Sequence, residues 1–186
     1  LAYQEVCAES ITRYGGTVYQ FQGDGVVAFF CYPRSHDDDP LRAVLASREI
    51  AQHMQLTARS TQRRRGVELQ CRIGIHTGLV SVQDGFGIGR AERRSIWGST
   101  PNLASRLQGV AAPGTVVMSG ETAELVGFRV SATPLGEHVL KGIARPVPVF
   151  RVDAARPTGG FDLPSEQLTP LIGRSAEIAA LDGHWR

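Results

Sequence analysis

Residues 17–31 read TVYQFQGDGVVAFFC and predict a β-hairpin. Up to residue 22 the side chains alternate between two faces of a strand, and the unbroken apolar run after the turn predicts a strand buried on both faces. Gly23 and Gly25 suit the positive φ angles of a tight turn. Asp24 stands between them, so the tip of the hairpin carries a carboxylate flanked by backbone that a ligand can approach closely.

Helices and strands alternate along the rest of the chain. Thr100 is expected to be the N-cap of a helix that Pro101 begins, since both residue types favour those positions. The interleaved order, with several hairpins, predicts an α+β fold with helices packed on one face of a mostly antiparallel sheet. We expect helices over residues 1–14, 37–58, 100–109 and 121–126, and strands over 69–76, 79–82, 95–97, 115–118, 128–131, 137–141 and 147–152.

The composition excludes several classes of protein. Hydrophobic residues make up 42% of the 186 residues and charged residues 20%, which is typical of a globular protein and not of a disordered one. The net charge of +2 gives no reason to expect nucleic acid as a partner, and the basic run 63–65 is expected in a solvated loop. No apolar run approaches the roughly 18 residues of a membrane span, so no membrane partner is expected. The three cysteines lack the spacing of a zinc site, which predicts buried thiols in the reducing cytoplasm.

Asp24 is the first candidate site residue. Mg²⁺ is commonly held by one or two carboxylates together with substrate phosphates, so a carboxylate on an open hairpin tip predicts a metal ligand. The alternative is that Asp24 only suits a tight turn, where Asp is common. The hairpin alone does not decide between the two.

A second group of candidates carries positive charge or an amide. Asn102 and Arg106 are four residues apart on a predicted helix and therefore face the same way. Asn102 also lies in the first turn, where free backbone N–H groups favour anions, and arginine binds phosphate through two parallel hydrogen bonds. Lys141, at a predicted strand end, suits a terminal phosphate as a point charge. Each is an ordinary surface residue if taken alone, but together with Asp24 they predict phosphoryl chemistry on a nucleotide.

The histidines give a weaker signal. The five of them are scattered without the spacing of metal ligands, and no order typical of nucleophilic catalysis is present. His76, at the end of a predicted strand, is expected to be a hydrogen-bonded structural residue, with a place in the lining of a polar site as the alternative.

From residue 1 to about residue 152 the sequence resembles the class III nucleotidyl cyclases, the adenylate and guanylate cyclase catalytic domain. The family's expected fold is a ferredoxin-like domain. The resemblance implies a phosphorus–oxygen lyase that acts in intracellular signal transduction. Such an enzyme converts ATP, or GTP, to a 3′,5′-cyclic nucleotide and pyrophosphate. It uses Mg²⁺ or Mn²⁺, with two ions expected in the complete domain. It rests on motifs that occur in order at residues 15–16, 23–25, 32–33, 36–39, 72–78, 97–106, 113–116 and 140–143.

The resemblance also assigns roles. Asp24 corresponds to the second of two metal-binding aspartates, and Gly23 and Gly25 let the backbone approach the substrate. Asn102 and Arg106 correspond to the pair that orients the ribose and stabilises charge on the α-phosphate, and Lys141 to a lysine near the terminal phosphates. Such domains work as homodimers, with metal ligands from one subunit and the Asn/Arg pair and base-reading residues from the other.

The sequence departs from the family pattern in two places. In the family the first metal aspartate belongs to an opening strand, which would lie upstream of Leu1. We therefore expect a cyclase fold without its first strand, and a chain that is inactive by itself. The missing strand was either trimmed from the chain or is absent from the gene. Adenylate cyclases often place a lysine where this chain has Gln20, and an aspartate or threonine where it has Ser95. Gln and Ser both donate and accept hydrogen bonds, so either purine fits.

Two further interpretations stay open. A catalytically silent cyclase-homology module would bind nucleotide or a partner and regulate an attached ATPase. A diguanylate cyclase or polymerase palm uses similar metal chemistry, but here Gly25-Val26 follows Asp24 in place of Glu-Phe. We expect a cyclase domain over residues 1–153, followed by a Pro/Gly-rich linker over residues 154–169. Residues 170–186 resemble the beginning of an AAA or signalling-type ATPase module in cis.

Overall fold

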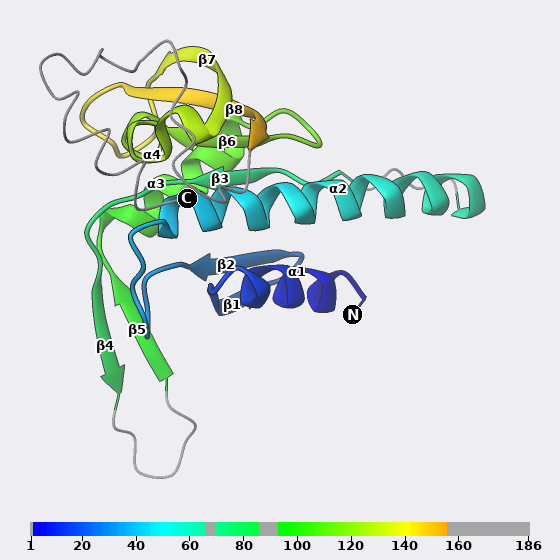
Figure 1. Ribbon diagram of the computed structural model, residues 1–186, viewed down its shortest axis with the longest axis horizontal. Helices are drawn as coiled ribbons and strands as arrows, with labels where there is room; N and C mark the ends of the chain where they lie inside the picture. Colours follow the sequence, from blue (N-terminus) through cyan, green and yellow to red (C-terminus); the bar gives the residue numbers. More distant parts are fainter. Residues whose placement is uncertain (1, 66–69, 86–92, 156–186) are drawn as a thin grey trace, which may run out of the picture.

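The computed structural model describes residues 2–65, 70–85 and 93–155 (Figure 1). Its helices are α1 (Ala2–Arg13), α2 (Asp39–Arg65), α3 (Ser99–Val110), α4 (Gly120–Val126) and the 3-10 helix η1 (Gly127–Arg129). Its strands are β1 (Thr17–Gln22), β2 (Gly25–Phe29), β3 (Ile73–Ile75), β4 (Ser81–Gly85), β5 (Arg93–Trp97), β6 (Val116–Ser119), β7 (Val130–His138) and β8 (Val147–Ala155). The predicted α+β class is confirmed. The expectation that the helices pack on one face of the sheet is wrong, because α2 and α4 pack on the face that carries Met118 while α3 packs on the face that carries Val117.

The described strands form three sheets. A four-stranded sheet has the order β3-β6-β8-β7, while β1-β2 and β4-β5 are separate antiparallel hairpins. Within the larger sheet β3 and β6 are parallel and the other pairs antiparallel, so the sheet is mostly antiparallel, as predicted. The parallel pair needs a crossover, which the chain makes through β4, β5 and α3. The β4-β5 hairpin extends away from the rest of the domain (Figure 1).

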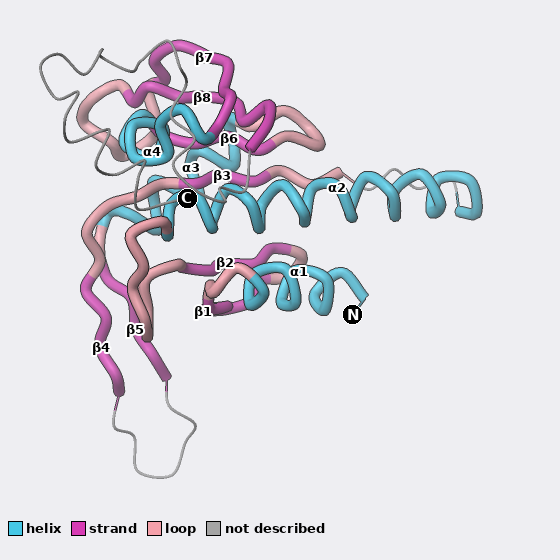
Figure 2. The backbone as a smooth tube through the Cα atoms, in the orientation of Figure 1, coloured by secondary structure: helices cyan, strands magenta, loops and turns pink. Residues whose placement is uncertain are grey.

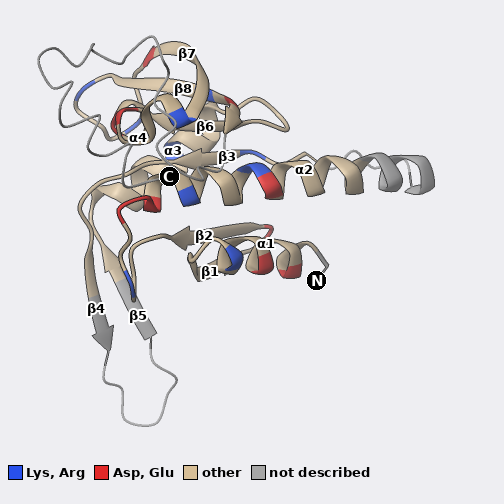
Figure 3. Ribbon diagram, viewed as in Figure 1, with Lys and Arg blue, Asp and Glu red and all other residues tan. Residues whose placement is uncertain are grey.

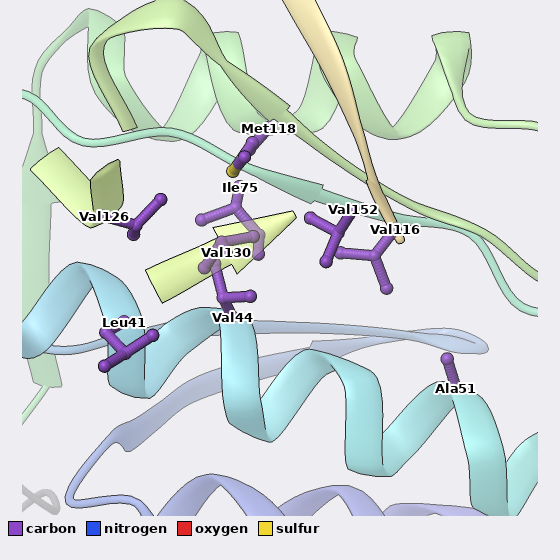
Figure 4. Close-up of a cluster of buried hydrophobic side chains, with 9 residues drawn as sticks. All are labelled: Leu41, Val44, Ala51, Ile75, Val116, Met118, Val126, Val130 and Val152. Carbon is purple, nitrogen blue, oxygen red and sulfur yellow. The ribbon is translucent and has the colours of Figure 1, made fainter. Parts of the chain in front are cut away.

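The long helix α2 lies between two layers (Figure 2). One side packs against the four-stranded sheet, where Val44, fully buried, meets Ile75 and Met118 in the largest apolar cluster (Figure 4). Its other side packs on α1, through Ile50. Burying apolar side chains on both sides fixes the β1-β2 hairpin and the larger sheet relative to a single helix.

The acidic residues at the start of α2 have structural partners. Asp38 pairs with Arg42, with 2.6 Å between Oδ1 and Nε, and the buried Asp39 accepts a hydrogen bond from the backbone N–H of His36 at 2.9 Å. Figure 3 shows this acidic segment at the start of α2. These partners hold both carboxylates at the start of α2, in the region where the sequence predicted a helix over residues 37–58.

Several expectations about individual elements are wrong. The strand after the hairpin turn is half-buried at every residue, because the hairpin forms a two-stranded sheet of its own. The basic run 63–65 is helical, as the last turn of α2, and arginine has a good helix propensity. Two expected strands are one continuous strand, β7, at the edge of the four-stranded sheet, where a proline is tolerated although it has no N–H. Phe128 lies in η1 and not in a strand.

Most residues of the predicted linker and ATPase module lie outside the described part of the chain. The predicted linker 154–169 begins inside β8, which ends at Ala155. Residues 156–186, with the rest of the linker and the predicted ATPase beginning, lie outside the described part of the chain. In the part that is described, no helix has both the length and the apolar character needed to cross a membrane.

Candidate functional site

The tip of the β1-β2 hairpin is a two-residue turn. Gln22 pairs with Gly25, which leaves Gly23 and Asp24 as the turn residues. Gly23 has a φ of 60° while Asp24 has no positive φ, the sign pattern of a type II′ turn, which favours glycine at its first position. Gly25 takes no positive φ and begins β2, so the expectation that both glycines need one is wrong.

Asp24 is exposed on this tip, and its carboxylate makes no hydrogen bond with any other described residue. The tip itself is held from outside the hairpin, because the Tyr3 hydroxyl of α1 donates to the carbonyl oxygen of Gly23 at 3.0 Å. A carboxylate in this setting is open to a cation and to solvent.

Helix α3 carries Asn102 and Arg106 on its exposed surface, one turn apart. Leu103 and Leu107 lie on the buried face of the same helix, with exposed fractions of 8% and 0%. Neither the Asn102 amide nor the Arg106 guanidinium bonds to another side chain among the described residues. Both groups are therefore available to a ligand, side by side on a helix that is fixed by its apolar face.

The start of α3 differs from the prediction. The N-cap is Gly98, with a φ of 139°, and the helix begins at Ser99, so Thr100 is not the cap. The Thr100 hydroxyl donates instead to the carbonyl oxygen of Leu79 at 2.7 Å. This hydrogen bond to a distant segment takes the hydroxyl away from the local cap, and it ties the beginning of α3 to the lead-in of β4.

Lys141 is exposed in the loop between β7 and β8, and β7 ends three residues earlier, so its predicted place at a strand end is wrong. The preceding residue, Leu140, is buried in the same apolar cluster as Leu103 and Leu107 of α3. A backbone hydrogen bond of 3.0 Å from Ile143 to Leu140 closes the turn. The fold therefore brings the Lys141 loop against the helix that carries Asn102 and Arg106.

The two expected base-reading positions lie on neighbouring segments. Gln20 is exposed on β1. Ser95 of β5 pairs through its backbone with Gln83 of β4, and the Ser95 side chain is not among the described parts of the chain. The backbone N–H of Ile96 donates to the Tyr19 hydroxyl at 3.4 Å. The residues next to Gln20 and Ser95 in the chain are thus in contact, a relationship between segments 77 residues apart that no local pattern could have indicated.

A single chain does not bring all of these residues together. The tip of the β1-β2 hairpin and α3 lie well apart in Figure 1. Among the described residues no group of three or more His, Cys, Asp or Glu side chains is placed to hold a metal ion, so Asp24 is not part of such a group here. The acidic tip and the Asn/Arg helix are two separate open surfaces.

His76 directly follows β3 and belongs to a polar network with Ser119 of β6 and Glu121 of α4. Its Nδ1 lies 2.8 Å from the Ser119 hydroxyl and 3.8 Å from Oε2 of Glu121. Burial lowers the pKa of His76 below its usual 6.5, and the Glu121 carboxylate opposes this shift only in part. The prediction of a hydrogen-bonded structural histidine is confirmed.

Comparisons with known proteins agree with this geometry. The profile of the family described as Adenylate and Guanylate cyclase catalytic domain matches residues 22–152, which include every candidate site residue except Gln20. Adenylate cyclase 1 of Rhizobium meliloti is 32% identical over 81% of this chain. The chain spans 23% of that cyclase and between 12% and 57% of other curated relatives.

Two solved structures resemble the fold at similar levels. The crystal structure of the adenylyl cyclase CyaB from P. aeruginosa has a TM-score of 0.75 at 31% identity, covering 86% of this chain and 82% of that one. The crystal structure of the guanylyl cyclase Cya2 has a TM-score of 0.76 at 30% identity, covering 83% of this chain and 78% of that one. With its profile match, its relatives and its fold in agreement, the chain belongs to the adenylate and guanylate cyclase catalytic domain family.

Proposed function

We propose that the protein containing this chain converts ATP, or GTP, to a 3′,5′-cyclic nucleotide and pyrophosphate. The ribose 3′-oxygen attacks the α-phosphorus, the bond to the pyrophosphate oxygen breaks, and the 3′-hydroxyl proton is lost. The observation that carries the proposal is the exposed, unpaired Asn102 and Arg106 pair on α3, within a chain of this family that also exposes Asp24.

Each site residue has one role in this proposed reaction. Asp24 would hold Mg²⁺ or Mn²⁺ together with the substrate phosphates, where the cation would supply positive charge to offset the charge of the phosphates. Gly23 leaves open space beside the turn, since a Cβ atom there would meet nothing within 4 Å. Asn102 orients the ribose, and Arg106 stabilises the charge that develops at the α-phosphate.

Three further residues bind the rest of the nucleotide. Lys141 contacts the terminal phosphates as a point charge, from a loop packed against α3. Gln20 and Ser95 read the purine edge, and because both side chains donate and accept, they are compatible with adenine or guanine. The chain's similar likeness to an adenylyl and a guanylyl cyclase supports leaving both substrates in the proposal.

The working unit is a homodimer with the site between its subunits. One protomer supplies Asp24 and the metal, and the other supplies Asn102, Arg106 and the purine-reading residues. The separation of the hairpin tip from α3 within one chain supports this division. A twofold axis then generates two equivalent sites. The three cysteines are all free, which suits a reducing cytoplasmic setting, but the expectation that all three are buried is wrong because Cys31 is exposed.

A second candidate is a silent cyclase-homology module that controls an ATPase in cis. It is supported by the single carboxylate at the hairpin tip among the described residues, and by Gln20 in place of the lysine expected of adenylate cyclases. In this case residues 154–169 are a linker and residues 170–186 begin the ATPase module. Nucleotide binding without turnover would favour it.

The test is cyclic nucleotide formation by the intact protein from ATP and from GTP, with Mn²⁺ and with Mg²⁺. Arg106→Ala is expected to lower kcat by about 10²–10³-fold while nucleotide affinity changes little, because the guanidinium acts on charge that develops in the transition state. Gln108→Ala, at an exposed position of the same helix, is the matched control and should keep wild-type kcat. Near-normal turnover by Arg106→Ala would remove Arg106 from the mechanism.

A further inference from the structure

β1 contains a bulge at Tyr19. Val18 pairs with Ala28 and Gln20 with Val27, so Tyr19 is an extra residue without a partner on β2. A bulge shifts the side-chain alternation of the strand by one residue and re-aims the side chains beyond it. The expected alternation of β1 is accordingly broken, with residues 17–19 half-buried and residues 20–22 exposed. The bulge therefore sets the orientation of the strand from Gln20 onward.

The side chain of the bulged residue connects two sheets. The Tyr19 hydroxyl accepts a hydrogen bond from the backbone N–H of Ile96 at 3.4 Å, although β1 and β5 belong to different hairpins. The Tyr19 ring lies beside Phe29 of β2, with 6.2 Å between ring centroids. One end of this side chain is thus held by its own hairpin and the other by β5.

The two bonded residues are the chain neighbours of the two proposed purine-reading residues. Tyr19 precedes Gln20, and Ile96 follows Ser95. We propose that Tyr19 is a specificity-positioning residue, whose hydroxyl fixes the spacing between Gln20 and Ser95 and so the discrimination between adenine and guanine nucleotides. This inference rests on the proposed function, since it assigns the purine to these two positions.

The other end of the hairpin offers a matched comparison. The Tyr3 hydroxyl donates to the carbonyl oxygen of Gly23, next to Asp24, in a bond between α1 and the turn. Removing the hydroxyl of Tyr3 or that of Tyr19 deletes one oxygen atom and one hydrogen bond that anchors the β1-β2 hairpin. The Tyr19 bond lies at the purine end, while the Tyr3 bond lies at the metal end, so the two losses should have different consequences.

The experiment measures kcat/KM of the intact protein for ATP and for GTP in wild type, Tyr19→Phe and Tyr3→Phe. Tyr19→Phe keeps the ring beside Phe29, and we expect it to move the ratio of the two kcat/KM values toward unity by about three- to tenfold, the range of one lost hydrogen bond. Tyr3→Phe is expected to leave the ratio unchanged and to raise the Mn²⁺ concentration needed for half-maximal rate. Thermal midpoints establish that each variant is folded.

A second variant removes the same bond from the other side. Ile96→Pro deletes the donor N–H at an edge of β5, where proline is tolerated, and leaves Tyr19 intact. It should move the purine ratio in the same direction as Tyr19→Phe. The inference is overturned if Tyr19→Phe keeps the wild-type ratio while Gln20→Ala changes it, if Tyr3→Phe changes the ratio as much as Tyr19→Phe, or if the wild type does not discriminate between the purines.

Binding of 3′-deoxy-ATP and 3′-deoxy-GTP separates this inference from the proposed function. These probes lack the attacking hydroxyl and report affinity alone. If no variant turns over nucleotide but the two affinities differ and Tyr19→Phe brings them together, the cyclase proposal fails and the role of Tyr19 stands. If neither probe binds the wild-type protein, both are overturned.

Discussion

Gly74 of β3 lies directly against the backbone of α3 at Leu107. A Cβ atom on Gly74 would stand 2.9 Å from the Leu107 carbonyl carbon and closer still to the Gln108 nitrogen and the Ala104 carbonyl oxygen. Backbone atoms of a helix cannot rotate away as a side chain can, so any side chain at this position must displace α3. The depth at which α3 sits on β3, and with it the position of Asn102 and Arg106, depends on this glycine.

Gly74→Ala is expected to lower the free energy of unfolding by about 1–3 kcal/mol, the usual range for overpacking a well-packed contact. Cyclase activity should fall as well, since α3 carries the proposed catalytic pair. Urea denaturation measures the first effect and initial rates the second. Gly109→Ala is the matched control on α3: a Cβ atom there meets nothing within 4 Å, so the change should stabilise the helix by about 0.5–1 kcal/mol. Equal stability of the two variants would show that the contact at Gly74 is not limiting.

The division of the site between protomers makes a prediction about mixtures. Asp24→Asn and Arg106→Ala are each expected to inactivate both sites of a homodimer. In a mixed dimer one site carries both changes and the other neither, so an equimolar mixture that exchanges subunits should recover about a quarter of wild-type activity. The measurement is the initial rate before and after co-refolding. A mixture that stays inactive, although the subunits are shown to exchange, would mean that both residues act within one chain or that the site is not shared.

His76 predicts how stability depends on pH. Burial lowers its pKa in the folded chain below the usual 6.5, and Glu121 of α4 is the charged group that faces it. Below about pH 6.5 the unfolded chain therefore binds this proton more readily than the folded chain, and the folded state loses stability as the pH falls toward the lowered pKa. Above pH 6.5 the contribution is constant.

The measurement is the difference in unfolding free energy between wild type and His76→Gln from pH 8 to pH 5. Gln keeps a side chain that can bond to Ser119 but does not titrate in this range. The advantage of the wild type should shrink as the pH drops below 6.5. A difference that stays constant across the range would show that His76 is not held in its neutral form by the fold.

Part of the candidate site could be predicted from local pattern. The Gly-Asp step between two strand-like runs indicated a hairpin with Asp24 at its tip, and helical spacing put Asn102 and Arg106 on one surface. These features depend on turn geometry and on the 3.6-residue period of a helix, both of which act over a few residues. The sequence did not predict the continuous strand β7, because Pro134 breaks the local pattern of a strand and only the pairing with β8 shows that β7 lies at a sheet edge, where proline is tolerated.

The remaining features needed the assembled molecule. Thr100 has a residue type that favours an N-cap, yet its hydroxyl bonds to Leu79, 21 residues away. The Tyr19 bulge and its contact with Ile96, the approach of Gly74 to α3, and the packing of the Lys141 loop on the same helix also join distant parts of the chain. The sequence by itself determined which chemical groups the hairpin tip and the helix present, because turns and helices form from neighbouring residues. Only the tertiary structure decided where those groups stand relative to one another, because that position depends on side chains that meet across long separations, where the free energy of packing and of single hydrogen bonds overrides local preference.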